Sequence, residues 1–281
     1  MNIVFTCQQG TTSHGVNGGN AALAKSAVNS SRLPSREELY RAPALDKGLD
    51  ILELLASRSG ALTRAEIVKE LGRGASEIYR MLERLVARGY VYRSAEGDRF
   101  ALSMKLFVLG QRHPPLRRLT ARAAPMMDAF ALEAGQSCHL VVRERDAAVV
   151  VANAAASADW VFTVRVGTPI DLLSTSSGQL LLAFLAEECQ SELMAHWKGT
   201  EKERVFARLA PQLARYRDAG YRIDESQQIF GVSDISVPIL SADGHTLAVL
   251  TCPYIRRMAA EAIDMERALA LLQRVARELT V

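Results

Sequence analysis

Residues 61–102 constrain the fold of this chain more than any other stretch, because helix signals, a sharp turn and a hairpin signal follow one another closely. Thr63 and Glu66 have the spacing of a capping box, which predicts that a helix begins there. Gly72 is placed to end that helix, since glycine tolerates a left-handed backbone. The turn Arg73-Gly74-Ala75 follows, and Ser76 is the expected N-cap of the next helix.

The segment after Ser76 predicts an amphipathic helix followed by a short hairpin. Its apolar residues recur at helical spacing and are expected to face a core that also receives leucines from a first helix over 45–57. After Gly89 the period becomes extended, and residues 90–93 and 99–102 flank a polar loop with a glycine. Two helices, a turn and such a hairpin predict a winged helix-turn-helix, whose second helix enters the major groove of double-stranded DNA.

The charge of the chain limits how DNA would be bound. The net charge is +3, and residues 44–110 hold eleven Lys and Arg against nine Asp and Glu, which is not the dense basic surface of a non-specific nucleic-acid binder. Between Arg73 and Arg93, however, arginines outnumber carboxylates. The alternative is a solvated helix face on which Glu77 pairs with Arg80 and Arg84. The cap, the turn and the wing together favour DNA binding.

Length and composition indicate a regulator with more than one domain. The chain has 281 residues, enough for two cores, and its 49% hydrophobic content excludes general disorder. No apolar run is long enough to span a membrane. Four cysteines without paired spacing predict neither a zinc ribbon nor a disulfide framework, so we expect no metal, no cofactor and a cytoplasmic location. Residues 1–42 are expected to form a flexible tail, without the features of a secretory signal.

The remainder of the chain predicts an α+β sensor-like domain. A linker helix is expected over 104–116, and a long helix that Pro125 kinks or restarts begins at Leu116. Beyond residue 117, strands and helices alternate irregularly, and residues 235–240 and 247–251 flank a good hairpin turn. The other expected strands are 138–142, 148–151 and 161–166, and the expected helices are 177–185, 202–219 and 259–279.

Three blocks of sequence resemble the IclR family of transcriptional regulators. They are SEIYRMLERLVARGYV at 76–91, RVGTPIDLLSTSSGQLLLAF at 165–184 and GYRIDESQQIFGVSDISVPIL at 220–240, within a match over about 44–280. The resemblance implies a winged helix-turn-helix over 43–103, the linker helix, and a GAF-like mixed α/β effector-binding domain over 117–281. It further implies a small-molecule effector, and homodimers or homotetramers on pseudo-palindromic operators.

The chain departs from the family pattern at both expected sites. Glu77 stands where relatives often carry threonine in the recognition helix, and a carboxylate there would repel phosphate but accept from cytosine N4. Ser226 and Gln227 stand where many relatives carry acidic residues. The operator and the effector are therefore expected to differ from those of better-known members.

Arg80 is the first candidate for DNA contact, because an arginine can bind guanine O6 and N7 in bidentate fashion. Thr63 and Arg64 are expected to anchor phosphate at a helix start, and the wing arginines to meet phosphate or a minor groove. The full set of DNA-binding candidates is Thr63, Arg64, Arg73, Ser76, Glu77, Tyr79, Arg80, Arg84, Arg93 and Arg99.

The effector is expected at the loop 173–178, which opens a helix whose free amides suit a carboxylate. The resemblance implies a facing wall and an aromatic lid. Ordinary helix capping remains the alternative for the serines, and an acidic wall would favour hydroxyl or amino groups over the expected carboxylic acid. The effector-binding candidates are Trp160, Phe162, Thr175, Ser176, Ser177, Gly178, Asp224, Asp234, Thr251 and Cys252.

Two other classes of function are alternatives to a DNA-binding regulator. A thiol enzyme would need Cys138 with His139, which point to opposite faces of a strand, or Cys252 with Asp234. A sensor whose helix-turn-helix contacts only protein is the other alternative. We therefore predict a DNA-binding regulator that is not an enzyme. A small metabolite would shift its conformational equilibrium, and whether this represses or activates transcription stays open.

Overall fold

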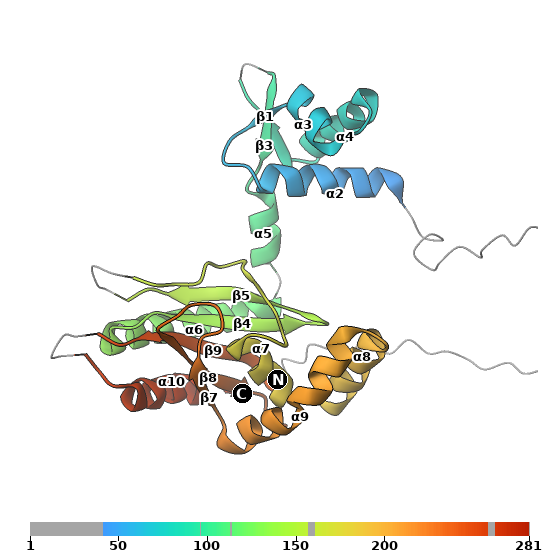
Figure 1. The fold of residues 1–281 in the computed structure, drawn as a ribbon. Helices are drawn as coiled ribbons and strands as arrows, with labels where there is room; N and C mark the ends of the chain where they lie inside the picture. The colour runs from blue at the N-terminus through green and yellow to red at the C-terminus, as the bar shows by residue number, and fades with distance from the viewer. Residues whose placement is uncertain (1–41, 96, 113, 157–160, 258–261, 281) are drawn as a thin grey trace, which may run out of the picture. The chain divides into compact units, whose positions relative to one another are not determined.

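A computed structural model describes residues 42–95, 97–112, 114–156, 161–257 and 262–280 (Figure 1). The described residues form two compact units, 42–112 and 114–280, each of which has its own core. The tail expected over 1–42 lies outside the described residues, except for Ala42.

The N-terminal unit is a small helical core with a three-stranded antiparallel sheet in the order β1-β3-β2. Ile51, Ile67, Ile78 and Leu82 are fully buried and join the helices around one core. This confirms the predicted helix-turn-helix at the N-terminal end of a mixed fold. The elements are α2 (Pro43–Ala56), β1 (Leu62–Thr63), α3 (Arg64–Leu71), α4 (Ala75–Ala87), β2 (Val91–Arg93), β3 (Arg99–Leu102) and α5 (Lys105–Gln111).

The helix-turn-helix confirms one predicted cap and corrects another. The Thr63 amide donates to Glu66 Oε2 at 2.7 Å and Thr63 Oγ1 accepts from the Glu66 amide at 3.2 Å, which completes the capping box. Gly72 ends α3 with a φ of 60°. The prediction that Ser76 is the N-cap of α4 is wrong. The amides of Glu77 and Ile78 both donate to the Gly74 carbonyl at 3.1 Å, so Gly74 is the N-cap and the helix begins two residues earlier than expected.

The C-terminal unit is built on an antiparallel sheet in the order β6-β5-β4-β9-β8-β7. One face of the sheet carries α6 and α10, and the other carries α7, α8 and α9 (Figure 1). The strands are β4 (Cys138–Glu144), β5 (Ala147–Ala154), β6 (Pro169–Ile170), β7 (Arg222–Glu225), β8 (Val232–Leu240) and β9 (Thr246–Ile255). The helices are α6 (Pro114–Ala134), α7 (Ser176–Ala183), α8 (Glu187–Trp197), α9 (Glu201–Ala219) and α10 (Met265–Leu279).

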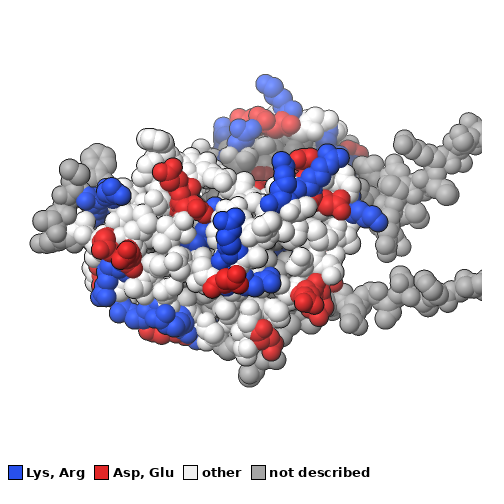
Figure 2. Space-filling model, turned by 60° about the horizontal axis from the view of Figure 1, so that its bottom comes forward, with Lys and Arg blue, Asp and Glu red and all other residues white. Residues whose placement is uncertain are grey.

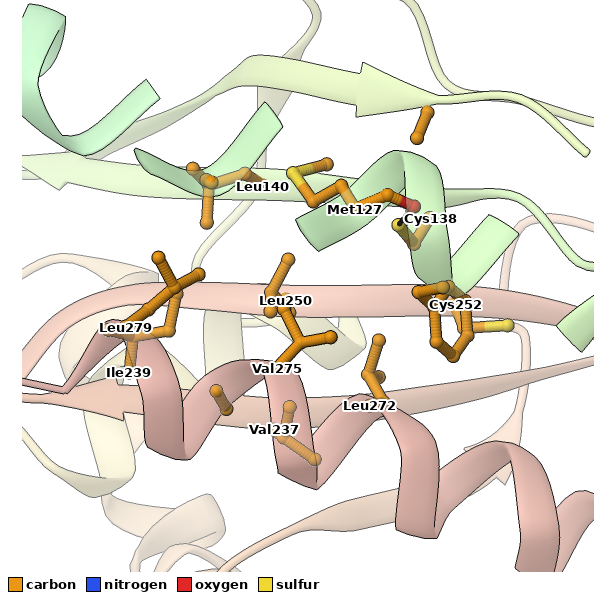
Figure 3. Packing of buried hydrophobic residues seen from close by; sticks show 14 of the residues in the cluster. Met127, Cys138, Leu140, Val237, Ile239, Leu250, Cys252, Leu272, Val275 and Leu279 are labelled. Carbon is orange, nitrogen blue, oxygen red and sulfur yellow. Dashed lines mark hydrogen bonds between the residues drawn. The ribbon is translucent and has the colours of Figure 1, made fainter. Parts of the chain in front are cut away.

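Alternation along the strands separates two apolar cores. Leu250 and Cys252 of β9 pack with Ile235 of β8 on the face covered by α6 and α10, as Figure 3 shows for the first two. Val249 packs on the opposite face with Leu180 of α7. Because successive side chains of a strand point to opposite faces, Thr251 lies on the α7 side.

Several expected elements differ in the structure. No strand forms over 161–166. Instead, Asn153 Nδ2 donates to the Val164 carbonyl at 2.8 Å and to Thr163 Oγ1 at 3.2 Å, so a side chain holds this extended segment in place of a ladder. The sequence did not predict α8 or β7. Helix α6 continues through Pro125. Helix α10 begins only after its N-cap Asp264.

The surface carries charges of both signs. On the face shown in Figure 2, basic and acidic side chains are interspersed among uncharged residues. Across the described ranges, no helix is both long and apolar enough to cross a membrane. Nor do three or more His, Cys, Asp or Glu residues of that part of the chain gather in a way that could hold a metal ion.

Candidate functional site

The outer face of α4 presents the side chains expected to reach DNA. Ser76, Arg80 and Arg84 are exposed, and Tyr79 is 46% exposed. Neither Arg80 nor Arg84 forms an ion pair within the part of the chain that the structure describes. Arg80 borders a groove between the start of α2 and α4, together with Lys47. The face therefore offers two arginines with uncommitted guanidinium groups.

Glu77 is engaged by a neighbouring helix. Lys47 Nζ of α2 lies 2.7 Å from Glu77 Oε1, and this hydrogen bond and charge lower the pKa of the Glu77 carboxyl. The alternative, in which Glu77 pairs with Arg80 and Arg84, is not seen among the described residues, since α2 brings Lys47 closer to Glu77. Glu77 thus anchors α4 to α2 and leaves both arginines available.

Two further candidate arginines contact the helix-turn-helix itself. The Arg64 guanidinium lies over the Tyr79 ring, 5.5 Å from its centroid, and links the start of α3 to α4. Arg73, in the turn, pairs with Asp50 of α2. An exposed ion pair of this kind contributes about 0–1 kcal/mol, so it does not prevent Arg73 from exchanging Asp50 for phosphate.

Contacts within the N-terminal unit hold the side chains of the two wing arginines in place. Arg93 Nε donates to the Gly97 carbonyl, and its guanidinium lies 5.6 Å from the centroid of the Phe100 ring. Arg99 Nη1 donates to the Ala61 carbonyl at 3.0 Å. Both side chains remain exposed, at the base of the hairpin where they were expected.

In the C-terminal unit, the expected loop leads into α7. Side chains of the same loop already accept hydrogen bonds from several of its backbone amides. Asp171 Oδ1 accepts from the amides of Leu173 and Ser174 at 3.0 and 2.7 Å. Burial alone would raise the pKa of Asp171, but these bonds and one from the Ser174 hydroxyl outweigh it and lower the pKa. Thr175 Oγ1 accepts from the Gly178 amide at 3.0 Å. Among the described residues, the backbone amides of Ser176 and Ser177 have no hydrogen-bond acceptor, because the first amides of a helix have no partner within it.

The serines of this loop belong to a buried chain of hydroxyl groups. Ser176 Oγ lies 2.9 Å from Ser236 Oγ, and Ser236 Oγ lies 2.8 Å from Thr251 Oγ1. Ser177 Oγ lies 2.8 Å from Thr251 Oγ1. All four residues are at most 4% exposed. The structure therefore brings Ser176, Ser177 and Thr251 together as expected and adds Ser236.

This chain of hydroxyls is part of a polar row that crosses the sheet on its α7 face. Directly opposite residues on neighbouring strands are Arg222 and Ser236, Ser236 and Thr251, Thr251 and His139, and His139 and Asn153. Side chains that lie opposite each other in an antiparallel pair share a face. Sequence reasoning missed Arg222, Ser236 and His139. The spacing of Ser236 two residues after Asp234 was the available signal, but the pairing of strands was unknown.

Two buried polar atoms near this row have no partner among the described residues. They are Nδ1 of His139 and Oε1 of Gln179. Burial lowers the pKa of His139 to about 4, so the ring is neutral at physiological pH and offers one donor and one acceptor nitrogen. Gln179, on α7, donates through Nε2 to the Leu173 carbonyl at 2.6 Å. Unpaired buried groups of this kind cost about 1–3 kcal/mol each, and a polar ligand would relieve that cost.

The expected acidic residues lie at the end of the row. Asp224 Oδ2 accepts from Arg222 Nε at 2.6 Å and from the Tyr216 hydroxyl at 2.9 Å. Asp234 lies directly opposite Asp224 and is half-buried. Burial, together with the charge of Asp224, raises the pKa of Asp234 despite a hydrogen bond with Ser226 and the charge of Arg222.

Of the three remaining effector candidates, Cys252 lies away from this site. Cys252 cannot share a wall with Thr251, because adjacent strand residues point to opposite faces and Cys252 lies in the α6–α10 core (Figure 3). Trp160 lies outside the described residues. Phe162 is half-buried in the segment that Asn153 holds.

The thiols do not have the character of a nucleophile. Burial raises the pKa of Cys138 to about 12 and raises the pKa of Cys252 well above its usual range. Reactive cysteines have a lowered pKa and an accessible sulfur. These two cysteines are therefore packing residues.

Comparison with known families matches both units. The IclR helix-turn-helix domain matches residues 44–95, and the Bacterial transcriptional regulator IclR C-terminal family matches residues 116–281. Together the two matches cover most of the chain.

Curated relatives are bacterial regulators. The chain is 23% identical over 212 residues to the HTH-type transcriptional regulator XynR of Escherichia coli K12, covering 74% of this chain and 84% of XynR. It is 24% identical over 217 residues to the HTH-type transcriptional repressor AllR of the same strain, covering 75% of this chain and 79% of AllR. These matches are to regulators of transcription and not to enzymes.

Solved structures share the fold. One is Pseudomonas aeruginosa HmgR, with 25% identity and a TM-score of 0.63, covering 85% of this chain and 100% of HmgR. Another is an IclR homolog from Microbacterium hydrocarbonoxydans complexed with 4-hydroxybenzoate. It has 22% identity and a TM-score of 0.68, covering 84% of this chain and 97% of the homolog.

Proposed function

Since this chain belongs to the IclR family of DNA-binding transcriptional regulators, we propose that a small metabolite bound between α7 and the sheet controls how it binds its operator. The observation that carries this proposal is the polar row beneath α7. An apolar core tolerates buried polar groups only when they are bonded, yet His139 and Gln179 keep unpartnered atoms there. A ligand that supplies those bonds would be stabilised by them.

For the operator, the uncommitted guanidinium groups of α4 support direct base contact by Arg80, with Arg84 and Ser76 beside it. Tyr79, ordered by Arg64, and the capped start of α3 at Thr63 support phosphate contacts. The remaining candidates Arg73, Arg93 and Arg99 are exposed enough to reach phosphate, whereas Glu77 acts by positioning α4 through Lys47.

The prediction that the effector is a carboxylic acid has limited support. The amides of Ser176 and Ser177 suit an anion, and a structural relative is complexed with 4-hydroxybenzoate. Asp171 and Thr175, however, already occupy the neighbouring amides. The proposed effector is therefore a small polar metabolite. Which charge on that metabolite the site prefers depends on the acidic residues at the end of the row.

Exposed apolar residues of the N-terminal unit support a homodimer. On α5, Leu106, Phe107, Val108 and Leu109 are all exposed, Phe107 to 59%. Apolar patches of this kind mark protein contacts. A dimer, or a pair of dimers, would present two recognition helices to the half-sites of a pseudo-palindromic operator.

The control mechanism is a shift between two populations of the dimer. A metabolite that binds one arrangement of the recognition helices more tightly than the other shifts the equilibrium by that difference in affinity, and one with equal affinities shifts nothing. The contact of α7 with β8 and β9 through hydroxyls is the element that a ligand would rearrange.

The DNA half is tested by footprinting the DNA upstream of the protein's own gene. Arg80→Ala is expected to weaken specific binding by about 1–3 kcal/mol, since a bidentate base contact is lost. Arg88→Ala is the matched control, because Arg88 is exposed at the other end of the same helix. Equal affinity of Arg80→Ala and wild type would contradict the assignment.

The ligand half is tested with Thr251→Val, which removes the central hydroxyl of the row and keeps the side-chain shape. We expect metabolites that alter wild-type DNA binding to lose their effect on this variant, while its DNA affinity without metabolite is retained. A full response by Thr251→Val would place the effector elsewhere.

A further inference from the structure

We propose that Asp234 makes the effector site select a ligand with a positively charged amino group over the corresponding carboxylate. This inference rests on the proposed function, because it concerns the ligand of the same site. It is carried by the charges on the α7 face of the sheet and by the two buried polar atoms without partners.

The cation of the site is already paired. Arg222 is 3% exposed, and its Nε donates to Asp224 Oδ2 at 2.6 Å while Nη1 donates to the Thr175 carbonyl at 3.1 Å. Its guanidinium also lies 5.1 Å from the centroid of the Tyr216 ring. Arg222 therefore holds β7 to the start of α7, and its buried guanidinium is already engaged by the Asp224 carboxylate and the Thr175 carbonyl.

The carboxylates outnumber that cation. Asp234 lies opposite Asp224 in the β7–β8 pair and on the same face as Ser236, two residues further along β8. Its side chain forms a hydrogen bond with the Ser226 hydroxyl, and no ion pair forms at Asp234 among the described residues. Asp171, near the start of α7, is already satisfied by loop amides and by the nearby charge of Lys202, so the balance is decided by Asp224 and Asp234 against Arg222. The face thus carries an excess of negative charge.

A half-buried carboxylate without an ion pair is stabilised more by a nearby cation than a fully hydrated carboxylate is. Burial weakens its hydration, and the nearby Asp224 repels it, which raises the pKa of Asp234. A ligand ammonium would supply the missing opposite charge, whereas a ligand carboxylate would add another like charge. The same electrostatic argument applies to both ligands, so their order of affinity follows from the sign alone.

The rest of the row fits an uncharged polar part of the ligand. His139 is 4% exposed, lies directly opposite Thr251 and has an unpartnered Nδ1. Gln179 is 3% exposed and has an unpartnered Oε1. Both side chains are uncharged at physiological pH, so they would bond hydroxyl or carbonyl groups of the ligand and leave its charge to Asp234.

The experiment uses compounds that differ only in the charged group. One series is 4-hydroxybenzylamine, 4-hydroxybenzyl alcohol and 4-hydroxybenzoate, a second is 6-amino-6-deoxyglucose, glucose and glucuronate, and a third is ethanolamine, ethylene glycol and glycolate. Each compound is titrated against the full chain, with binding measured by calorimetry and by the rise in melting temperature. Asp234→Asn is the test variant. Asp243→Asn, at an exposed turn of the β8–β9 hairpin, is the matched control.

We expect the amine of at least one series to bind about tenfold or more tightly than its carboxylate. Asp234→Asn should remove that preference, and Asp243→Asn should keep it. The inference would be overturned if the wild-type protein bound the carboxylate as tightly as the amine, or if Asp234→Asn kept the preference for the amine. Either result would leave the proposed function intact. If no compound of any charge binds, the site beneath α7 is wrong, and both the proposed ligand control and its charge selection fail.

Discussion

Gly178 shows how closely a single residue fits the start of α7. A Cβ atom at this position would lie 2.3 Å from the Asp171 carbonyl oxygen and 2.6 Å from Leu172 Cα. Only glycine allows the loop that Asp171 organises to pack against the helix.

Gly178→Ala is therefore expected to destabilise the C-terminal unit by about 1–3 kcal/mol, the usual cost of overpacking. Urea unfolding of the full chain measures this change. Gly110→Ala, on helix α5 where a Cβ would meet nothing within 4 Å, is the control and should show no loss. A Gly178→Ala protein as stable as wild type would mean that the loop adjusts without cost.

Asp234 gives a prediction about pH. Its pKa is raised in the folded protein above the ordinary value of 3.8, so the folded state binds its proton more tightly than the unfolded state does. The stability that protonated Asp234 contributes is present below the ordinary value and is lost as pH rises through the raised pKa. Asp234→Asn should therefore gain melting temperature relative to wild type at about pH 7 and less at about pH 4. A difference independent of pH would show that Asp234 is not the titrating group.

Residue-level prediction succeeded where one helix decided the answer. The 3.6-residue period placed Arg80 and Arg84 on the outer face of α4, which needs no knowledge of other elements. It did not find that Lys47 engages Glu77, because α2 lies elsewhere in the sequence. His139, Ser236 and Arg222 were missed for the same reason, since the polar row exists only in the register of the strands.

Among the elements, α3 depends on a cap that the sequence displays openly. Thr63→Ala would remove the hydroxyl that accepts from the Glu66 amide and is expected to cost about 0.5–2 kcal/mol in the N-terminal unit. Urea unfolding followed by circular dichroism measures the loss. Thr63→Ser keeps the hydroxyl and should keep most of the stability. Equal losses in the two variants would point to the Thr63 methyl group and not to the cap.

Boundaries and short elements were predicted less well than long helices. Ser76 has the chemistry of an N-cap, but the turn geometry gives that role to Gly74. Residues 161–166 have strand-like composition, yet they bond to the Asn153 side chain and not to a ladder. Composition describes what a segment can form, and the neighbours that decide lie far away in the sequence.

At the scale of the whole molecule, the exposed apolar side chains of α5 predict self-association. Phe107→Glu would place a charge on the proposed dimer surface, and we expect it to shift the protein from dimer toward monomer and to weaken operator binding. Sedimentation velocity over a range of protein concentrations measures the first effect. Arg112→Glu, an exposed charge change at the C-cap of α5, is the control. A Phe107→Glu protein that remains dimeric would exclude α5 from the interface.

The sequence blocks at 76–91, 165–184 and 220–240 indicated the family correctly, and the family matches cover 44–95 and 116–281. The helix-turn-helix followed from local signals alone. Local signals did not reveal which face of the sheet Cys252 occupies. Strand alternation nevertheless excludes Cys252 and Thr251 from the same wall, because adjacent residues of a strand point to opposite faces. The identity of the metabolite depends on how charges from separate strands add up in space, which local patterns do not contain.

Ligand control of this regulator requires that metabolite binding and operator binding be coupled in one protein. The most direct measurement is a gel-shift titration of the full chain on the DNA upstream of its own gene, with and without each amine, alcohol and carboxylate of the three series. We predict a shifted operator complex whose dissociation constant changes at least about fivefold with one compound, the lower end of usual allosteric coupling. Operator binding that no bound compound alters would contradict this prediction.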